Sequence, residues 1–468
     1  MAYRFENYFI SFKGIVTLTL AFCSAAANGF DGWDVSNLNA RNSALKQDYF
    51  SMQDDYDIWV NPALLQAYPN RVYSALGTAL FSQGDDTHAR LAGGQLTLGP
   101  VNAGVYMGRP YTGVIQNTLF SPGLISTPGN LIAMTAPSVA VKNLLDLFLS
   151  MDLGIADAGL RVNINRYADQ RFNPVGAQAN GTSVNIDEQK VSGSDVNLVF
   201  GAALKSLPLD VSLSIGLPSF TNNYVYQESS TIGGTLDRQG HASLDDTTNI
   251  AATARMDVLA LSKGLVRLSA QASRFSFKIG QTNRETTNGT ATVDQTGEST
   301  LTSTELAGYA TFLLKPSEKI TLIASGGLQY FHTTYTTAST DKLNANPLRN
   351  SYANSLYHAD FPARLGVEVA ADGHWTLRGG ASRNLYRIDR FSGGSSVAGG
   401  VTQPLSSPRQ QTIDADPLVE LALGIRYALD DAFLIDGTIN KDILHTGSYL
   451  LSGVSDQLLT QISLIYKF

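Results

Sequence analysis

Two short acid–histidine sets are the first candidates for chemistry in this sequence. Asp85-Asp86-Thr87-His88 and Asp372-Gly373-His374 each place carboxylates beside an imidazole, a combination used in general acid–base catalysis and in metal binding. Both sets lie in sequence typical of turns, where such residues are mostly solvated. Asp245 and Asp246 together offer too few ligands for calcium. The histidines are scattered, without metal-ligand spacing, at positions 88, 241, 332, 358, 374 and 445.

No signature of catalysis or cofactor binding accompanies these sets. The sequence contains no HExxH motif, no GxSxG motif and no glycine-rich phosphate-binding loop. We therefore expect no enzyme activity, no metal site and no cofactor. A net charge of −7 and a pI near 5.4 also argue against a nucleic-acid-binding surface.

A second group of charged residues stands at alternate positions of apolar stretches. In 361–369, Leu365 and Val367 alternate with Arg364 and Glu368, so one face suits lipid and the other suits water. A charge that faces lipid near mid-membrane costs about 2–4 kcal/mol, which places these charges inside. They would either tune the field of a water-filled pore or form ion pairs that stiffen the wall or hold a plug. The same reasoning gives the pore-lining candidates Arg161, Arg255, Arg267, Arg364, Glu368, Arg378, Glu420, Arg426 and Asp436.

The elements that must position these charges are the strands of a barrel. From residue 71 onward, segments of roughly ten residues alternate apolar and polar side chains, which is the length that a tilted transmembrane strand needs. We count about sixteen such segments, with fourteen as the alternative. The sequence therefore predicts an all-β chain, with a transmembrane antiparallel β-barrel over residues 71–468.

The connections between these segments fall into two classes that alternate along the chain, as in barrels with short periplasmic turns and long extracellular loops. The short connections carry turn-forming residues and lie at 156–158, 206–208, 316–319, 371–373 and 430–431. The predicted long loops are rich in Thr, Asn, Ser and Gly and lie at 169–192, 218–247, 281–299, 336–355, 389–411 and 444–457.

The first residues are typical of an export signal. A basic stretch precedes a short apolar core at 14–22, and Ala25-Ala26-Ala27 offers a cleavage site. We predict a signal peptide over residues 1–27. Its removal would leave the mature chain without cysteine, because Cys23 is the single one. The alternative is that Cys23 is lipidated.

The last strand of the predicted barrel ends in alternating apolar residues: Ile462, Leu464, Tyr466 and Phe468. Ile465 is the one apolar residue on the opposite face. The pattern resembles the C-terminal assembly signal that the barrel-insertion machinery of Gram-negative bacteria reads. The resemblance implies a location in the outer membrane of a Gram-negative bacterium. Outer-membrane lipid, lipopolysaccharide and the insertion machinery are then the expected partners, and the oligomeric state stays open.

Residues 28–70 do not follow the strand rhythm. They contain the acidic residues Asp54, Asp55 and Asp57, followed by Trp59 and by Asn61-Pro62-Ala63. This order resembles the N-terminal hatch of the outer-membrane fatty-acid transporter family, in which a segment of similar size precedes the first strand and plugs the lumen. The resemblance implies Trp59, Asn61, Pro62 and Ala63 as hatch residues. The alternative is a periplasmic lead-in that anchors at the barrel mouth.

Three functions follow from these features. The leading interpretation is an outer-membrane channel for the passive passage of a small-molecule solute through a polar lumen. A barrel similar to the fatty-acid transporters, plugged by residues 28–70, would move hydrophobic compounds instead. A structural or adhesive barrel would bind partners through its long outer loops.

Overall fold

The computed structural model describes residues 40–47, 49–77, 89–108, 142–172, 176–177, 182–230, 234–343, 349–391, 395–398, 401–404, 409–414, 419–439 and 459–468. These residues are mostly in strands. They also form helix α2 (Ala40–Leu45) and two 3-10 helices, η2 (Asp55–Trp59) and η3 (Pro62–Ala67). None of the helices in these ranges is long and apolar enough to cross a membrane.

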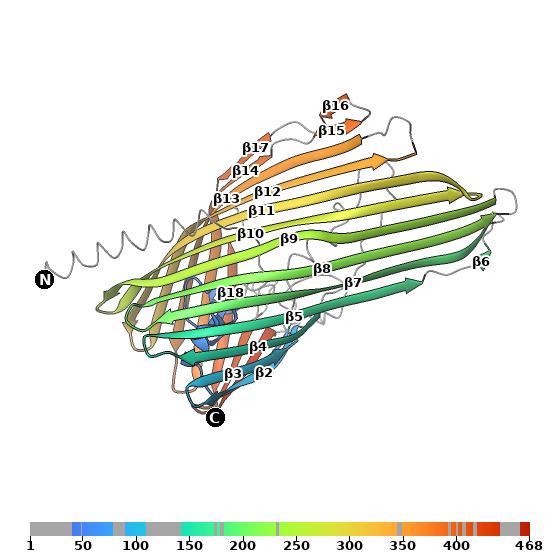
Figure 1. Ribbon diagram of the computed structural model, residues 1–468. Helices are drawn as coiled ribbons and strands as arrows, with labels where there is room; N and C mark the ends of the chain where they lie inside the picture. Colours follow the sequence, from blue (N-terminus) through green and yellow to red (C-terminus); the bar gives the residue numbers. More distant parts are fainter. Residues whose placement is uncertain are drawn as a thin grey trace, which may run out of the picture.

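Sixteen strands close into an antiparallel barrel (Figure 1), which confirms the predicted fold class. Each strand pairs with its neighbours along the chain, and β20 pairs with β1 as well as with β19. Around the ring, the strands are β1 (Arg71–Gly77), β2 (Ala89–Leu98), β3 (Val101–Met107), β4 (Lys142–Asp152), β5 (Ala156–Phe172), β7 (Thr182–Leu204), β8 (Leu209–Ser230), β9 (Gly234–Leu261), β10 (Gly264–Thr287), β11 (Thr290–Ser317), β12 (Ile320–Asp341), β13 (Arg349–Ala370), β14 (Trp375–Phe391), β18 (Glu420–Ala428), β19 (Phe433–Ile439) and β20 (Leu459–Lys467). Four short strands extend the wall: β6 (Gly176–Ala177), β15 (Ser395–Ala398), β16 (Val401–Pro404) and β17 (Arg409–Asp414).

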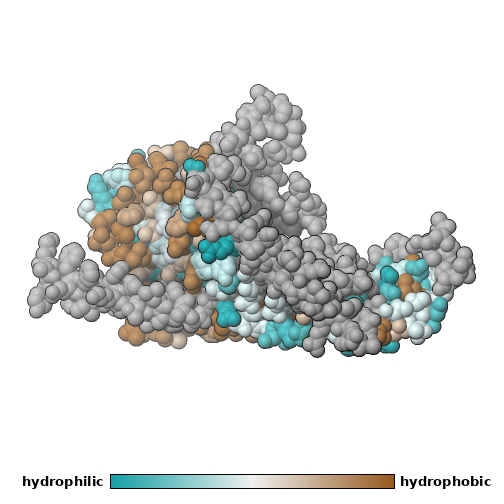
Figure 2. All heavy atoms as spheres, turned by 90° about the horizontal axis from the view of Figure 1, so that it is seen from above, coloured by the Kyte–Doolittle hydropathy of each residue, from teal (hydrophilic) through white to brown (hydrophobic). Residues whose placement is uncertain are grey.

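The two faces of the wall follow the alternation of the sequence. On β10, every second residue from Arg267 to Asn283 is at most 6% exposed and faces the interior. The outward positions change from the apolar Leu268 and Ala270 to the exposed Arg274, which marks the outer limit of the lipid-facing band on this strand. Figure 2 shows apolar side chains gathered toward one end of the wall and hydrophilic ones on the part that projects from it.

The strands on one side of the barrel are much longer than the sequence predicts. The stretches predicted as loops at 169–192, 218–247, 281–299, 336–355 and 389–411 are largely strand, and β9 and β11 each run for 28 residues. A membrane crossing needs only about 9–11 residues, so these strands project well beyond the lipid (Figure 1). The loop prediction is wrong there because a sheet outside lipid no longer needs apolar residues at alternate positions. The predicted loop 444–457 lies outside the described residues.

The turns at the opposite end agree better with the sequence. Those predicted at 206–208, 316–319, 371–373 and 430–431 lie at strand ends. The turn predicted at 156–158 is wrong by three residues, because Ala156 already begins β5 and Gly154 makes the turn with a φ of 82°. At the projecting end, Asn288-Gly289 joins β10 to β11 with φ values of 50° and 77°, as a two-residue hairpin turn requires.

The residues of the C-terminal pattern face outward on β20. Tyr466 and Phe468 are 48% and 63% exposed, whereas the alternate residues Ser463 and Ile465 are buried. Ile465 interrupts the polar face because it packs against apolar residues inside the barrel. The inward face of β20 is thus apolar at Ile465, although its other inward residues Gln461 and Ser463 are polar.

The lipid-facing band can be tested at Leu365, whose side chain is 62% exposed on the outside of β13. We expect Leu365→Arg to lower the free energy of unfolding by about 2–4 kcal/mol in lipid, because it puts a cation in the apolar layer. Thr282→Arg, at an exposed outward position of β10 beyond Arg274, should change it little. Urea unfolding in vesicles measures both, and equal losses would contradict the position of the band.

Candidate functional site inside the barrel

Residues 40–47 and 49–70, called here the inner segment, lie inside the ring of strands (Figure 1). Helix α2 packs against β13, β14, β18, β19 and β20, and η3 packs against β3, β4, β5 and β7 on the opposite side. The side chains of Tyr49, Trp59 and Leu65 are at most 2% exposed. The inner segment therefore spans the interior from one wall to the other.

Pairs of glycines on adjacent strands make room for the backbone of the inner segment. Gly159 on β5 is directly opposite Gly201 on β7, and a Cβ on either would overlap atoms of Asn61, Pro62 or Ala63. A side chain at either position would force the wall and the segment apart.

The same arrangement occurs across the barrel. Gly366 on β13 is opposite Gly380 on β14, and both lie under the backbone of Leu45. Gly424 on β18 lies under Ala44. We call these two places the glycine seats.

The Asn61-Pro62-Ala63 sequence shapes the inner segment and attaches it to the wall. The Asn61 side chain accepts a hydrogen bond from the Ala63 backbone N–H at 3.1 Å, which caps η3. Its Nδ2 donates to the Ala202 carbonyl of β7 at 3.3 Å. Pro62 begins the helix, where its missing N–H leaves no donor unused.

Trp59 is held by its backbone as well as by its ring. Its carbonyl accepts a hydrogen bond from Arg161 Nη1 at 2.8 Å. Its ring meets those of Tyr106 and Phe148 edge-on, with centroids 5.1 and 4.9 Å away. These wall residues come from β3, β4 and β5.

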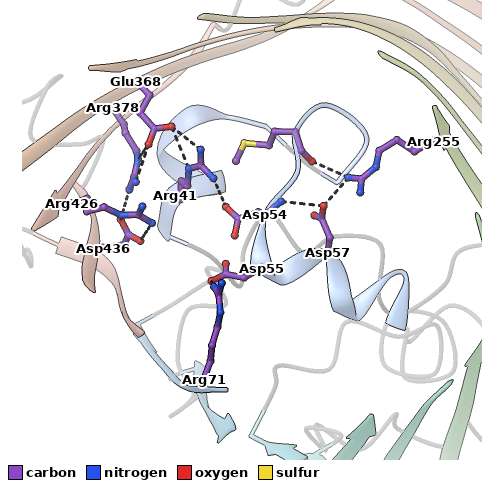
Figure 3. Close-up of polar contacts among 11 residues, drawn as sticks. Arg41, Asp54, Asp55, Asp57, Arg71, Arg255, Glu368, Arg378, Arg426 and Asp436 are labelled. Carbon is purple, nitrogen blue, oxygen red and sulfur yellow. Dashed lines mark hydrogen bonds and ion pairs between the residues drawn. The ribbon is translucent and has the colours of Figure 1, made fainter. Parts of the chain in front are cut away.

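Arg255 makes the most extensive buried polar contact between wall and inner segment (Figure 3). It forms ion pairs with Asp57 at 2.7 Å and with Asp210 at 2.9 Å. It also donates to the carbonyls of Tyr49 and Met52 at 2.8 and 3.0 Å. Asp57 is wholly buried, so Arg255 satisfies a charge that would otherwise be isolated.

A second set of ion pairs joins α2 to the opposite wall (Figure 3). Arg41 contacts Asp54 at 2.9 Å and Glu368 at 2.8 Å. The two carboxylates offset the cost of burying the charge of Arg41. The set continues across β13, β14, β18 and β19: Arg378 bonds Glu368 and Asp436, and Arg426 bonds Asp436 at 2.7 Å.

The remaining pore-lining candidates also face inward. Arg161 pairs with Asp146 at 2.7 Å, Arg267 with Asp257 at 2.6 Å, and Glu420 with Lys46 at 3.0 Å. The guanidinium of Arg364 lies 5.5 Å from the centre of the Tyr309 ring. With most of these charges in ion pairs, the geometry favours the interpretation in which they stiffen the wall or hold a plug.

Sequence reasoning missed which residues pair across the interior. Each of Asp54, Asp55 and Asp57 meets an arginine: Arg41, Arg71 and Arg255, respectively. Arginines on the inward face of distant strands, such as Arg71 and Arg255, could have indicated partners for these carboxylates. Inward-facing glycines at paired positions of neighbouring strands could have indicated where the inner segment lies close to the wall.

The acid–histidine sets do not join this site. Asp372 accepts hydrogen bonds from the backbone N–H groups of Trp375 and His374, both at 2.7 Å, and these hold its pKa below the usual range. It is therefore a turn residue in an exposed connection. Asp85 to His88, the signal peptide 1–27 and Cys23 lie outside the described residues. Within the described ranges, no group of three or more His, Cys, Asp or Glu is placed to hold a metal.

The glycine seats can be tested with two adjacent residues. A Cβ at Gly380 would overlap the Leu45 backbone, whereas one at Gly379 would lie 3.5 Å from the nearest atom, in ordinary contact. We expect Gly380→Ala to lower the free energy of unfolding by about 1–3 kcal/mol and to make the inner segment more accessible to protease. Gly379→Ala should do neither. Equal protease sensitivity of the two variants would contradict a close seat for Leu45.

The buried ion pairs can be compared with an exposed one. We expect Arg255→Met to lower the free energy of unfolding by about 3–5 kcal/mol, because it leaves Asp57 buried without its cation. Lys46→Met breaks a partly exposed pair and should cost at most about 1 kcal/mol. Urea titration of both variants in the same lipid would measure the difference, and losses of similar size would refute it.

Comparison with known proteins gives similarity of fold alone. No family model matches the chain, and no curated protein matches its sequence. The Pseudomonas putida toluene transporter TodX is 12% identical over 93% of this chain and 97% of its own, with a TM-score of 0.37. The Ralstonia pickettii toluene transporter TbuX is 10% identical over 89% and 94%, with a TM-score of 0.35. The CymD monoaromatic hydrocarbon channel is 9% identical over 94% and 98%, with a TM-score of 0.36. With its closed ring of strands and outward apolar band, the chain is an outer-membrane β-barrel protein.

Proposed function

We propose that this barrel moves small hydrophobic compounds across the outer membrane, past an inner segment that plugs the lumen. The observation that carries the proposal is the position of the inner segment, which packs against both sides of the wall. An open channel for polar solutes relies on a water-filled lumen. Here the central part of the interior holds an apolar cluster that includes Tyr49, Phe50, Trp59 and Leu65.

The inward face of the wall farther out gives independent support. On β10, the inward positions change from Gln271 and Ser273 to Phe275, Phe277 and Ile279. The two phenylalanine rings lie 4.9 Å apart, and each of the three side chains is at most 4% exposed. Apolar and aromatic surface is typical of sites that take up hydrophobic molecules.

The proposal can be tested in cells that keep an intact lipopolysaccharide leaflet, because this leaflet slows apolar compounds and makes their uptake measurable. We expect the protein to raise the uptake of naphthalene over that of cells without it. Uptake of arabinose, a polar solute of similar size, should stay unchanged. An adhesive barrel would raise neither.

Planar-bilayer recording separates a plugged barrel from an open channel. We expect little steady ion conductance from the intact protein, and a several-fold increase after deletion of residues 40–69, because the deletion empties the lumen. A large conductance of the intact protein that the deletion leaves unchanged would reject the plugged barrel. The passive channel for polar solutes would then be the better description.

A further inference from the structure

A small void separates the inner segment from strands β1, β2 and β3. Its volume is about 10 Å³, enough for about one water molecule. The rings of Tyr56, Trp59, Tyr73 and Tyr106 line it, together with Gln95. We call this space the ring slot.

The rings of the slot already contact each other edge-to-face. The centroids of Tyr56 and Tyr73 are 4.6 Å apart, and those of Trp59 and Tyr106 are 5.1 Å apart. Gln95 fixes one end of the slot, because it accepts a hydrogen bond from the Tyr106 hydroxyl at 2.7 Å. A flat ring compound could take the same edge-to-face positions toward these side chains.

The slot also contains polar groups that lack partners. The Tyr56 side chain is 2% exposed, and its hydroxyl has no hydrogen-bond partner among the described residues. The Nε of Arg71 is likewise buried without one. A buried hydroxyl without a partner is costly, so a ligand with one polar substituent would satisfy a group that the protein leaves unsatisfied.

A single ion pair stands at the solvent end of the slot. Asp55 and Arg71 contact each other at 2.9 Å, and their side chains are 16% and 17% exposed. The rings behind them are 2–6% exposed. Arg71 begins β1 and is paired with Lys467 near the end of β20, at the same end of the barrel as the short turns. Figure 3 shows the pair on the side of the inner segment that faces β1, apart from the other two sets of ion pairs.

The attachment of the inner segment to β1, β2 and β3 differs from its attachment elsewhere. Toward β5, β7, β13, β14 and β18 its backbone lies directly on the glycine seats. Toward β2 and β3 it is held by side chains, as where Asn102 Nδ2 donates to the Leu65 carbonyl at 3.2 Å. Side chains can turn aside without a shift of the backbone, so here the interior can widen without separating backbone from backbone as it would at a glycine seat.

We propose that the ring slot binds flat, uncharged ring compounds with one polar substituent, and that the Asp55–Arg71 pair closes their way out to the periplasm. The inference rests on the proposed function, and it names the substrate class and the exit. In the closed slot there is room for about one water. A ring enters when the tyrosine rings turn, and it leaves toward the periplasm when Asp55 and Arg71 separate.

Binding can be followed through Trp59. The chain has three tryptophans, and the double variant Trp33→Phe/Trp375→Phe leaves Trp59 as the only one. We expect 4-bromophenol to quench its fluorescence in a saturable way, because the bromine approaches the indole in the slot. Gln95→Phe fills the slot and should weaken binding about tenfold or more. Lys46→Met, on the far side of the inner segment, should leave binding unchanged.

A second variant keeps the test decisive if Gln95→Phe does not fold. Tyr56→Phe removes only the hydroxyl, so it should weaken the binding of 4-bromophenol several-fold and leave that of bromobenzene unchanged. Quenching that does not saturate, or that Tyr56→Phe and Gln95→Phe both leave unchanged, would overturn the ring slot as a binding site.

The gate is tested by uptake in cells. We expect Arg71→Met to raise the initial rate of 4-bromophenol uptake several-fold over the intact protein, with no such increase for Lys46→Met. Equal rates for the two variants would overturn the gate while the proposed function stands. If the intact protein itself gives no uptake above cells that lack it, the proposed function fails, and the Trp59 titration still decides whether the slot binds rings.

Discussion

The interior of this barrel depends on the need of each buried arginine for a carboxylate. Arg255 reaches inward from β9, and Asp57 of the inner segment and Asp210 of β8 neutralise it. Without the inner segment, Arg255 would lose Asp57 and the two carbonyls that accept its remaining hydrogen bonds. Arg161 depends on the inner segment in the same way. Its Nε donates to Asp146 of the wall, and its Nη1 donates to the Trp59 carbonyl of the inner segment. Wall and inner segment therefore stabilise each other through charges that neither could bury alone.

The glycine seats complement these ion pairs in a different way. The ion pairs fix the distance between inner segment and wall through long side chains, whereas the seats let backbone meet backbone. Paired glycines are costly within a strand, since they contribute no side chain to packing. Their alignment at Gly159 with Gly201 and at Gly366 with Gly380 is best explained by what lies over them.

The sequence predicts the wall of this barrel better than its interior. Alternation is a local signal, so the inward direction of Arg364 and Glu368 and the outward direction of Leu365 follow from neighbouring residues alone. The length of the strands beyond the membrane cannot be predicted from neighbouring residues, because a sequence rich in Thr and Ser is equally compatible with a loop and with a polar sheet. The pairing of Arg255 with Asp57 depends on how residues almost two hundred positions apart meet across the lumen, and no local pattern encodes that. Ile465 is a partial exception: its break in alternation was visible, but its cause lies inside the barrel.

The long strands on one side have a consequence for the path of an apolar molecule outside the cell. A strand of 28 residues extends about 90 Å along its own direction, against an apolar band of about 25 Å in such barrels. Even when tilted, the wall rises past the acyl chains into the height that the sugar chains of an outer leaflet occupy. Those sugars are hydrated and charged, and they hold apolar compounds back from the lipid. For the function proposed above, a one-sided wall of this height would keep the sugars away from the barrel mouth on that side, so that a compound could reach the mouth without crossing their full depth.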